Sequence, residues 1–331
     1  MSKLVTIYGG TGFVGRYIVH RMAQAGWRVR VAVRRPNEGL YVRTYGAVGQ
    51  VNLELCNIRD DASVAQAMRG ADAVINCVGT FDKGGKNNFD AVQHEGAGRI
   101  ARLAAAEGVE TLVHLSAIGA DKASDSLYLK SKALGEEAVL EHFPNAAILR
   151  PSVIFGTEDH FFNRFASMTR FSPVLPIVGG NTLFQPVFVD DVAVDDVAAA
   201  VEQVATGAAA PGVYELGGHD EMTLAEMMQM MLKIIQRRRF VFNMPFALAK
   251  FFAWWFDLWQ TVSRGLIRAP LTVDQVRTLK HHNVVGSGAK GFKELGLETQ
   301  MMAAVLPGYL WRFRVTGQYA ATTASANDLK T

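Results

Sequence analysis

Cysteine is scarce in this sequence. The 331 residues include only Cys56 and Cys77, too few for a disulfide framework and without the spacing of metal ligands. Both lie in apolar runs, so we expect buried thiols in a reducing compartment and no metal site. We also expect no export signal, because the apolar run from Leu4 to Tyr8 begins directly after Ser2-Lys3 and suits a strand.

A large surplus of charge of either sign is also lacking. The formal net charge is +3, yet residues 233–268 contain seven basic residues and a single acidic one, Asp257. That segment carries +6, which leaves −3 for the rest of the chain. We therefore expect no nucleic-acid-binding face and one local basic surface.

No apolar run is long enough to cross a bilayer about 30 Å thick. The most apolar stretch, residues 240–259, holds nine aromatic residues but is interrupted by Lys250 and Asp257. Arginines flank it, namely Arg237, Arg238, Arg239, Arg264 and Arg268. Tryptophans beside arginines suit a headgroup boundary or a large apolar partner, so we expect 237–268 to face a membrane surface or another protein. The alternative is a helix packed in its own core.

The first 150 residues alternate between short apolar strands and helical segments. The expected strands are Leu4–Tyr8, Arg28–Val33, Val51–Leu55, Ala73–Cys77, Thr111–Leu115 and Ala146–Leu149. The expected helices are Val14–Ala25, Ala62–Arg69, Phe89–Glu107 and Tyr128–His142. Continuous apolar strands alternating with helices predict an α/β protein with a doubly wound parallel (Rossmann) sheet. His114, inside the fifth strand, is expected to be a core histidine.

The regular alternation of strands and helices ends after Pro151. A strand at Gln185–Val189, a helix at Val192–Gln203 and a strand at Gly212–Leu216 are expected, so residues 185–218 are predicted to rejoin the domain formed by 1–152. Residues 153–184 and 219–318 form a smaller, mostly helical C-terminal lobe, and 319–331 a disordered tail. Within the lobe, Met222–Gln236 reads as a helix with a capping box of Thr223 and Glu226.

A glycine-rich loop, Gly9-Gly10-Thr11-Gly12-Phe13-Val14-Gly15, links the first strand to the first helix. Glycines there allow a sharp turn and let backbone N–H groups approach a pyrophosphate. The second strand ends without a carboxylate to bind a ribose hydroxyl and continues into Arg34-Arg35. Two guanidinium groups suit a 2′-phosphate, so the sequence predicts NADP(H) rather than NAD(H).

Several further segments resemble the extended, or atypical, short-chain dehydrogenase/reductase superfamily over about the first 220 residues. They are Asn76-Cys77-Val78-Gly79, Ser116, Tyr128-x-x-x-Lys132, the run from Arg150 to Gly156, and Gln185–Asp191. The resemblance implies that they line a cofactor cleft. Tyr128 and Lys132 share one helix face, where an ammonium group would lower the pKa of the phenol for proton transfer. If the protein is active, the expected catalytic residues are Ser116, Tyr128 and Lys132.

A narrower resemblance extends over nearly the whole chain. The runs 154–166, 185–187 and 270–276 resemble the dehydrogenase-like accessory subunit of respiratory complex I (NADH:ubiquinone oxidoreductase) in a bacterial form. This implies a bound NADPH without turnover, complex I peripheral-arm partners near the quinone region, and a peripheral place on the cytoplasmic face of the inner membrane. The expected cofactor contacts are Gly9, Thr11, Gly12, Phe13, Val14, Arg34, Arg35, Asn57, Val78, Gly79, Ser116, Tyr128, Lys132, Pro151 and Val153.

Three functions stay open at this stage. The first is the accessory subunit with NADP(H) as a structural ligand. The second is an NADP-dependent reductase, dehydrogenase or epimerase acting on a hydrophobic substrate. The third is a non-catalytic module that senses nucleotide occupancy.

Overall fold

The chain forms two compact units. A computed structural model describes residues 2–189, 197–262 and 269–319. The first unit comprises 1–152, 189–217 and 285–299, and the second comprises 153–188, 218–284 and 300–331. The expectations for Asp190, Asp191, the start of the 192–203 helix, Arg264, Arg268 and the tail from 320 onward fall outside the described residues.

A seven-stranded sheet in the order β11-β6-β5-β4-β1-β2-β3 forms the centre of the first unit. All its neighbouring strands are parallel. The strands are β1 (Leu4–Tyr8), β2 (Arg28–Val33), β3 (Val51–Leu55), β4 (Ala73–Asn76), β5 (Thr111–Leu115), β6 (Ala147–Pro151) and β11 (Val213–Leu216). The order reverses where β1 lies between β2 and β4, which makes this the switch point of the sheet. The predicted fold class is confirmed.

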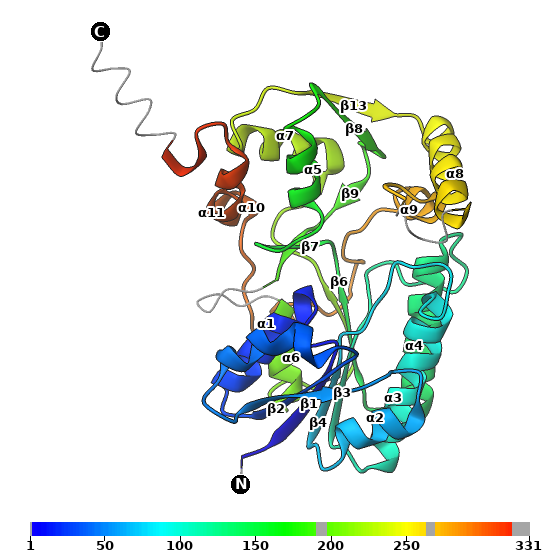
Figure 1. Cartoon of the computed structure of the whole chain (residues 1–331), viewed down its shortest axis with the longest axis vertical. Coiled ribbons are helices and arrows are strands. Elements are labelled where there is room, and N and C mark those ends of the chain that lie inside the picture. The colour runs from blue at the N-terminus through cyan, green and yellow to red at the C-terminus, as the bar shows by residue number, and fades with distance from the viewer. Residues whose placement is uncertain (1, 190–196, 263–268, 320–331) are drawn as a thin grey trace. The chain divides into compact units, whose positions relative to one another are not determined.

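Helices cover both faces of this sheet (Figure 1). α1 (Phe13–Gln24) and α6 (Val197–Ala205) pack together on one face, and α2 (Asp61–Met68), α3 (Glu95–Ala106) and α4 (Leu127–His142) cover the other. The expected helix at Phe89–Glu107 is divided, because a π-helical turn, η2 (Asp90–His94), precedes α3. A 3-10 segment, η1 (Pro36–Tyr45), follows β2, and another, η3 (Lys293–Leu295), lies in the last segment of the unit.

Small residues let α3 and α4 approach closely. A side chain on Gly135 would collide with the carbonyl oxygen of Gln93, and a Cβ on Gly98 would lie 3.0 Å from the Cβ of Ala138. Beneath them, fully buried Ile100 and Val139 join the core against the sheet. This close packing fixes α4, the helix that carries Tyr128 and Lys132.

The second unit contains three two-stranded sheets. β7 (Ile154–Phe155) pairs with β10 (Val187–Phe188), β8 (Val174–Val178) with β13 (Phe240–Met244), and β9 (Leu183–Phe184) with β12 (Met222–Thr223). Its helices are α5 (Phe162–Met168), α7 (Leu224–Ile234), α8 (Phe246–Val262), α9 (Val273–Thr278), α10 (Met302–Val305) and α11 (Pro307–Leu310), followed by 3-10 turns η4 (Trp311–Phe313) and η5 (Gly317–Tyr319). The predicted capping box of Thr223 and Glu226 is present at the start of α7.

Candidate functional site

The glycine loop turns so tightly that Gly9 and Gly15 both exclude side chains. Gly9 has φ +80°, and its N–H donates to the carbonyl of Ala32 at 3.2 Å. The N–H of Gly12 closes the turn by donating to the carbonyl of Gly9 at 2.9 Å. A Cβ on Gly15 would collide with the Gly9 carbonyl, so glycine there brings α1 against the end of β1.

The N-terminus of α1 has no side-chain cap. Gly12 is the N-cap residue, with φ −72° and no side chain to accept a hydrogen bond, and Phe13 and Val14 begin the helix. Such a helix start presents unsatisfied backbone N–H groups and a partial positive charge to an anion. The predicted loop residues therefore form a cradle of the kind that a pyrophosphate occupies.

The η1 segment covers one side of this loop, a contact that was not predicted from the sequence. The hydroxyl of Tyr41 donates to the carbonyl of Thr11 at 2.6 Å, and Thr11 fits against Gly39 because a side chain on that glycine would collide with it. The Arg16 guanidinium lies 5.2 Å from the centre of the Tyr41 ring. Pro36 at the first position of η1 was the available signal for this turn.

Arg34 and Arg35 both lie exposed just after β2. Arg35 forms an ion pair with Glu38 at 3.0 Å, whereas Arg34 has no polar partner within the described part of the chain. Because the Arg35–Glu38 pair is exposed, its contribution to stability is small, and a stronger anion could displace the carboxylate.

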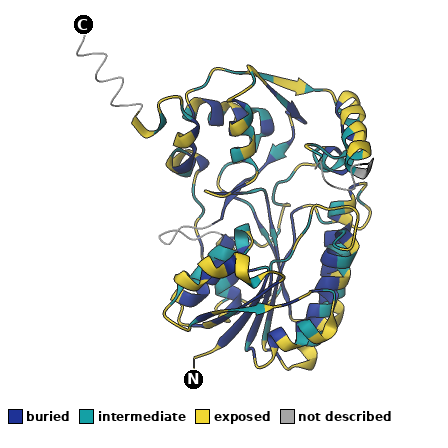
Figure 2. Cartoon of the chain, in the orientation of Figure 1, coloured by how far each residue is buried: buried dark blue, intermediate teal, exposed yellow. Residues whose placement is uncertain are grey.

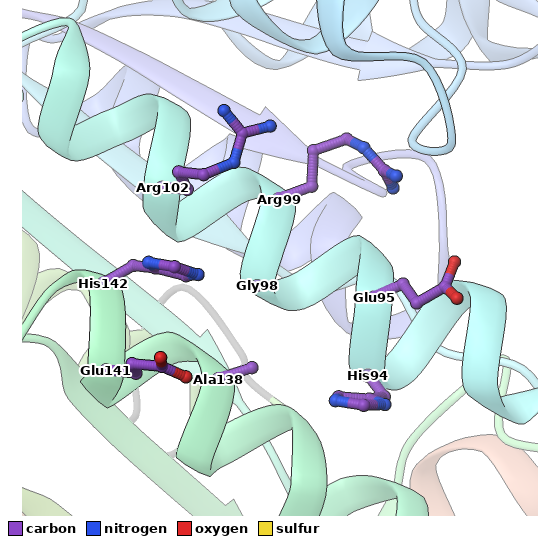
Figure 3. A pocket seen from close by; sticks show the side chains of 8 residues that line it. All are labelled: His94, Glu95, Gly98, Arg99, Arg102, Ala138, Glu141 and His142. Carbon is purple, nitrogen blue, oxygen red and sulfur yellow. The ribbon is translucent and has the colours of Figure 1, made fainter.

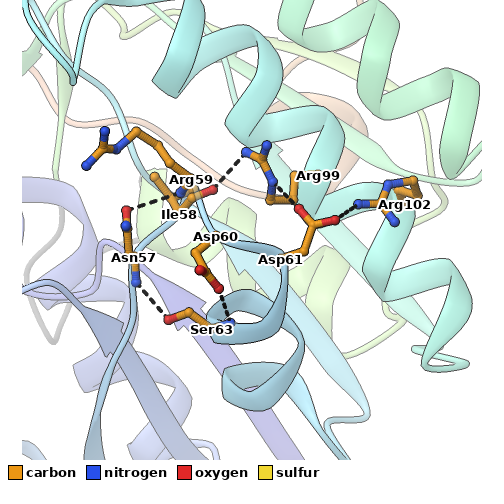
Figure 4. Close-up of polar contacts among 8 residues, drawn as sticks. All are labelled: Asn57, Ile58, Arg59, Asp60, Asp61, Ser63, Arg99 and Arg102. Atoms are coloured by element: carbon orange, nitrogen blue, oxygen red, sulfur yellow. Dashed lines mark hydrogen bonds and ion pairs between the residues drawn. The ribbon is translucent and has the colours of Figure 1, made fainter.

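Asn57 lies in the turn between β3 and α2 (Figure 4). Its N–H donates to Ser63 Oγ at 2.9 Å, and its side-chain oxygen accepts from the Arg59 N–H at 3.2 Å. Asp60 caps α2 by accepting from the Ser63 N–H. The side-chain oxygen of Asn57 is thus committed to the turn, and its exposed amide nitrogen is the group it could offer to a ligand.

Two buried polar atoms at the end of β5, His114 Nε2 and Ser116 Oγ, lack partners among the described residues. The Asn76 side-chain oxygen accepts from the Val78 N–H at 3.1 Å, so its amide nitrogen donates to His114 Nδ1 at 3.0 Å. This leaves the proton on His114 Nε2, which has no acceptor, and burial lowers the pKa of His114 to about 3. Ser116 Oγ is likewise buried without a partner. Gly79 lies beside the Lys132 ammonium.

Tyr128 and Lys132 lie on α4, which begins at the Ser126 cap. The Lys132 ammonium donates to the carbonyl of Leu115 at 3.0 Å, and its pKa falls to about 8 through burial. Burial raises the pKa of Tyr128 to about 12. The expectation that Lys132 lowers the pKa of the phenol is therefore wrong here, because desolvation dominates. Phe81 also stacks on the Tyr128 ring at 5.2 Å between centroids.

The first unit brings most of the predicted residues to one edge of its sheet. The glycine loop, Arg34, Asn57, Val78, Ser116 and Pro151 all follow or end parallel strands, whose carboxyl ends meet at the same edge. Val153 belongs to the second unit, where its N–H donates to Asn283 at 3.1 Å. The uncapped helix start, the glycine cradle and the unpartnered Ser116 Oγ fit a dinucleotide.

A groove between α3 and α4 is chemically different (Figure 3). Its volume is about 290 Å³, and its walls carry His94, Glu95, Gly98, Arg99, Arg102, Ala138, Glu141 and His142. Asp61 holds both arginines from α2 (Figure 4). Glu95 and Glu141 add two further carboxylates to the walls, so the arginine charges are compensated and this groove carries no functional assignment.

These features define a dinucleotide-binding protein of the Rossmann class. Residues 5–217 match the NAD dependent epimerase/dehydratase family, and the chain belongs to that family. Its fold is similar to that of an NADPH-dependent quinone oxidoreductase from Escherichia coli solved with NADPH, with a TM-score of 0.70 and 18% identity over 92% of this chain and 99% of that one. The chain thus has an NAD(P)-binding fold.

More specific relatives extend the similarity into the second unit. NADH dehydrogenase (ubiquinone) 1 alpha subcomplex subunit 9 of Arabidopsis thaliana mitochondria is 32% identical over 97% of this chain and 81% of its own length. The NADH-ubiquinone oxidoreductase 40 kDa subunit of Neurospora crassa is 31% identical over 98% and 83%. A ceramide reductase of Caulobacter vibrioides is 33% identical, but over 57% of this chain and 58% of its own.

The described residues contain neither a membrane-spanning helix nor a cluster of metal ligands. None of their helices has the length and apolar character needed to cross a membrane. No group of three or more His, Cys, Asp or Glu side chains in these ranges could hold a metal ion.

Cys56 is buried as expected, whereas Cys77 is partly exposed.

Proposed function

We propose that this chain is a nucleotide-binding, non-catalytic accessory subunit of respiratory complex I. The observation that carries the proposal is the similarity to complex I subunits along 97% of the chain, both compact units included. The peripheral arm near the membrane and quinone region is the proposed position, which in a bacterium lies at the cytoplasmic face of the inner membrane. NADP(H) bound to the first unit would stabilise the folded subunit, because it binds only the folded form.

The chemistry of Tyr128 supports a structural rather than a catalytic role. Proton transfer near neutral pH is most efficient when the pKa of the donor lies close to the working pH. Burial raises the pKa of Tyr128 to about 12, and Phe81 stacks on one face of its ring. A nucleotide ribose could still hydrogen-bond to Tyr128, Lys132 and Ser116, so these residues would position the cofactor.

The alternative is an NADP-dependent reductase acting on a hydrophobic substrate, which the similarity to a ceramide reductase favours. Purification from native membranes in mild detergent separates the two functions. Co-migration with a large NADH-oxidising complex, without NADPH oxidation by the isolated chain, supports the accessory subunit. A protein that purifies alone and oxidises NADPH in the presence of a lipid or quinone carbonyl compound would replace our proposal with the alternative.

We expect Arg34 to select NADPH over NADH. Replacing it with alanine removes a charged donor to the 2′-phosphate, and such hydrogen bonds contribute about 1.5–3 kcal/mol, or roughly a 10- to 100-fold change in affinity. Arg34→Ala should weaken NADPH binding by that factor and leave NADH binding unchanged, as measured by fluorescence titration. Arg35→Ala, whose side chain pairs with Glu38, should have the smaller effect. Tighter binding of NADH than NADPH by the wild type would refute NADP(H) selectivity.

The α8 helix presents the proposed membrane-facing surface. Ala249 and Ala253 pack one face into a small core with Val178 and Val276. The opposite face exposes residues spaced i, i+3, i+4, i+7 and i+8 on one helical stripe, namely Phe251, Trp254, Trp255, Leu258 and Trp259 (Figure 2). These exposed aromatic residues support the proposed membrane-facing role of the segment, although Phe240–Met244 is a strand rather than part of the helix.

Vesicle flotation tests this surface. Wild-type protein should float with vesicles containing anionic lipid, and a Trp254→Ser/Trp259→Ser variant should lose most of that binding, because its two half-exposed indoles no longer enter the headgroup boundary. Leu55→Ser, which alters an exposed apolar residue of the first unit, is the matched control. Equal flotation of the tryptophan variant and the wild type would show that α8 does not bind the membrane.

A further inference from the structure

A basic cavity lies in the second unit where α7 ends and β13 begins. Its volume is about 1000 Å³, and its cationic lining consists of Lys233, Arg237, Arg238 and Arg239. The remaining lining residues are neutral, so the wall contains no carboxylate. Within the described ranges, none of the four cations forms an ion pair with Asp or Glu.

Two of the arginines are held in place by neutral partners. Arg237 Nε donates to the carbonyl of Phe313 at 2.8 Å, and Arg239 Nε donates to that of Thr169 at 3.0 Å. Arg239 also donates to the Arg238 carbonyl at 3.0 Å through a terminal nitrogen. These bonds orient the guanidinium groups and leave their positive charges uncompensated. Preorganised guanidinium groups are the donors that suit the oxygens of a phosphate.

The backbone turn that places these arginines is unusual. Gln236 has φ +55°, a left-handed conformation that is usually occupied by glycine or asparagine at a helix end. The N–H groups of Gln236 and Arg237 donate to the carbonyls of Lys233 and Leu232, which closes the end of α7. Gln236 therefore adopts a strained backbone conformation at the turn after α7. The three arginines that follow this turn all line the same cavity.

The cations also repel one another. The pKa of Arg237 is lowered by burial and by the charges of Arg239 and Arg170. Repulsion among fixed positive charges falls when an anion binds between them. At the edge of the cavity, the largely exposed ring of Phe240 offers an apolar contact beside the charged wall.

We propose that this cavity binds an anionic phosphate ester, with Lys233 and Arg237–Arg239 as its ligands. The phosphate could belong to a lipid headgroup or to a soluble metabolite. The inference depends neither on the proposed role in complex I nor on the nucleotide site of the first unit. Contact of α8 with a membrane is likewise not required for it.

Calorimetric titration of the full chain tests the site. The protein is first saturated with NADPH, so that the probes do not compete for the glycine loop. The probes are glycerophosphoglycerol, dihexanoylphosphatidylglycerol below its micellar concentration, and zwitterionic dihexanoylphosphatidylcholine. We expect both phosphoglycerol probes to bind. A Lys233→Gln/Arg238→Gln variant should bind them at least tenfold more weakly, because two exposed cations that make no described side-chain hydrogen bonds are removed.

A Lys130→Gln/Arg69→Gln variant is the matched control, because it removes the same charge from the first unit. If the acyl chains raise affinity at least tenfold over the free headgroup, the ligand is a lipid. If the headgroup alone binds as tightly, it is a soluble phosphate. The proposal is overturned if the wild type binds neither phosphoglycerol probe, if phosphatidylcholine binds as well as phosphatidylglycerol, or if both double variants bind like the wild type.

Discussion

Replacing Gly12 with valine is expected to abolish stabilisation by nucleotide while leaving the folded protein intact. Gly12 has φ −72°, which any residue can adopt, and it is exposed. A Cβ there would meet only the carbonyl oxygen of Gly9, at 3.2 Å. The side chain would instead occupy the space in front of the first turn of α1, where the proposed pyrophosphate binds.

The size of this effect follows from linkage. NADPH at 100 times its Kd stabilises a one-site protein by about 2.7 kcal/mol. In a domain of this size that corresponds to a rise in Tm of about 5 °C. Differential scanning fluorimetry should show this rise for the wild type and none for Gly12→Val, with similar Tm values for both without nucleotide. Gly84→Val, at an exposed glycine with open space around it, should behave like the wild type. A full Tm rise in Gly12→Val would mean that the glycine loop does not hold the nucleotide.

The parallel sheet could be predicted from sequence because its signals are local. Continuous apolar runs end within a residue or two of the observed strands β1 to β6. The capping box that begins α7 is equally local, since Thr223 and Glu226 are three residues apart. The glycine loop is a third case, because the collision that excludes a side chain at Gly15 involves Gly9, only six residues earlier.

Contacts between segments that are far apart in the sequence could not be predicted from such local patterns. β8 and β13 pair in parallel although 61 residues separate Val178 from Phe240. Residues 285–299 join the first unit, where Lys290 bridges to Tyr214 beside β11. No periodicity in either segment identifies its partner, because pairing depends on the surfaces that the rest of the fold leaves uncovered.

Desolvation is the reason that the direction of the Tyr128 pKa shift was predicted incorrectly. The spacing of Tyr128 and Lys132 predicted their shared helix face but not their surroundings. Burial moves the pKa of the phenol up and that of the ammonium group down, to about 12 and about 8. The same spacing on an exposed helix would favour the opposite shift of the tyrosine. A Tyr-x-x-x-Lys motif therefore does not by itself establish proton transfer.

Arg150 is expected to contribute more to the stability of the first unit than any exposed ion pair. It lies on β6 and bonds to Glu136 of α4 at 2.6 Å and to Glu215 of β11 at 3.3 Å. All three side chains are largely buried. Glu215 also accepts from the Gly286 N–H at 2.8 Å, so the cluster joins three segments of the unit.

Arg150→Met should therefore cost about 3–5 kcal/mol in the free energy of unfolding, because two buried carboxylates lose their counter-charge and face each other. Urea unfolding followed by circular dichroism measures the change. Lys122→Met, which breaks an exposed pair with Glu137, should cost at most about 1 kcal/mol. Adding Glu136→Gln and Glu215→Gln to Arg150→Met should recover part of the loss, because neutral amides relieve the repulsion. A loss no larger than that of Lys122→Met would show that solvent screens the cluster, and that packing alone joins α4, β6 and β11 at the edge that holds Pro151.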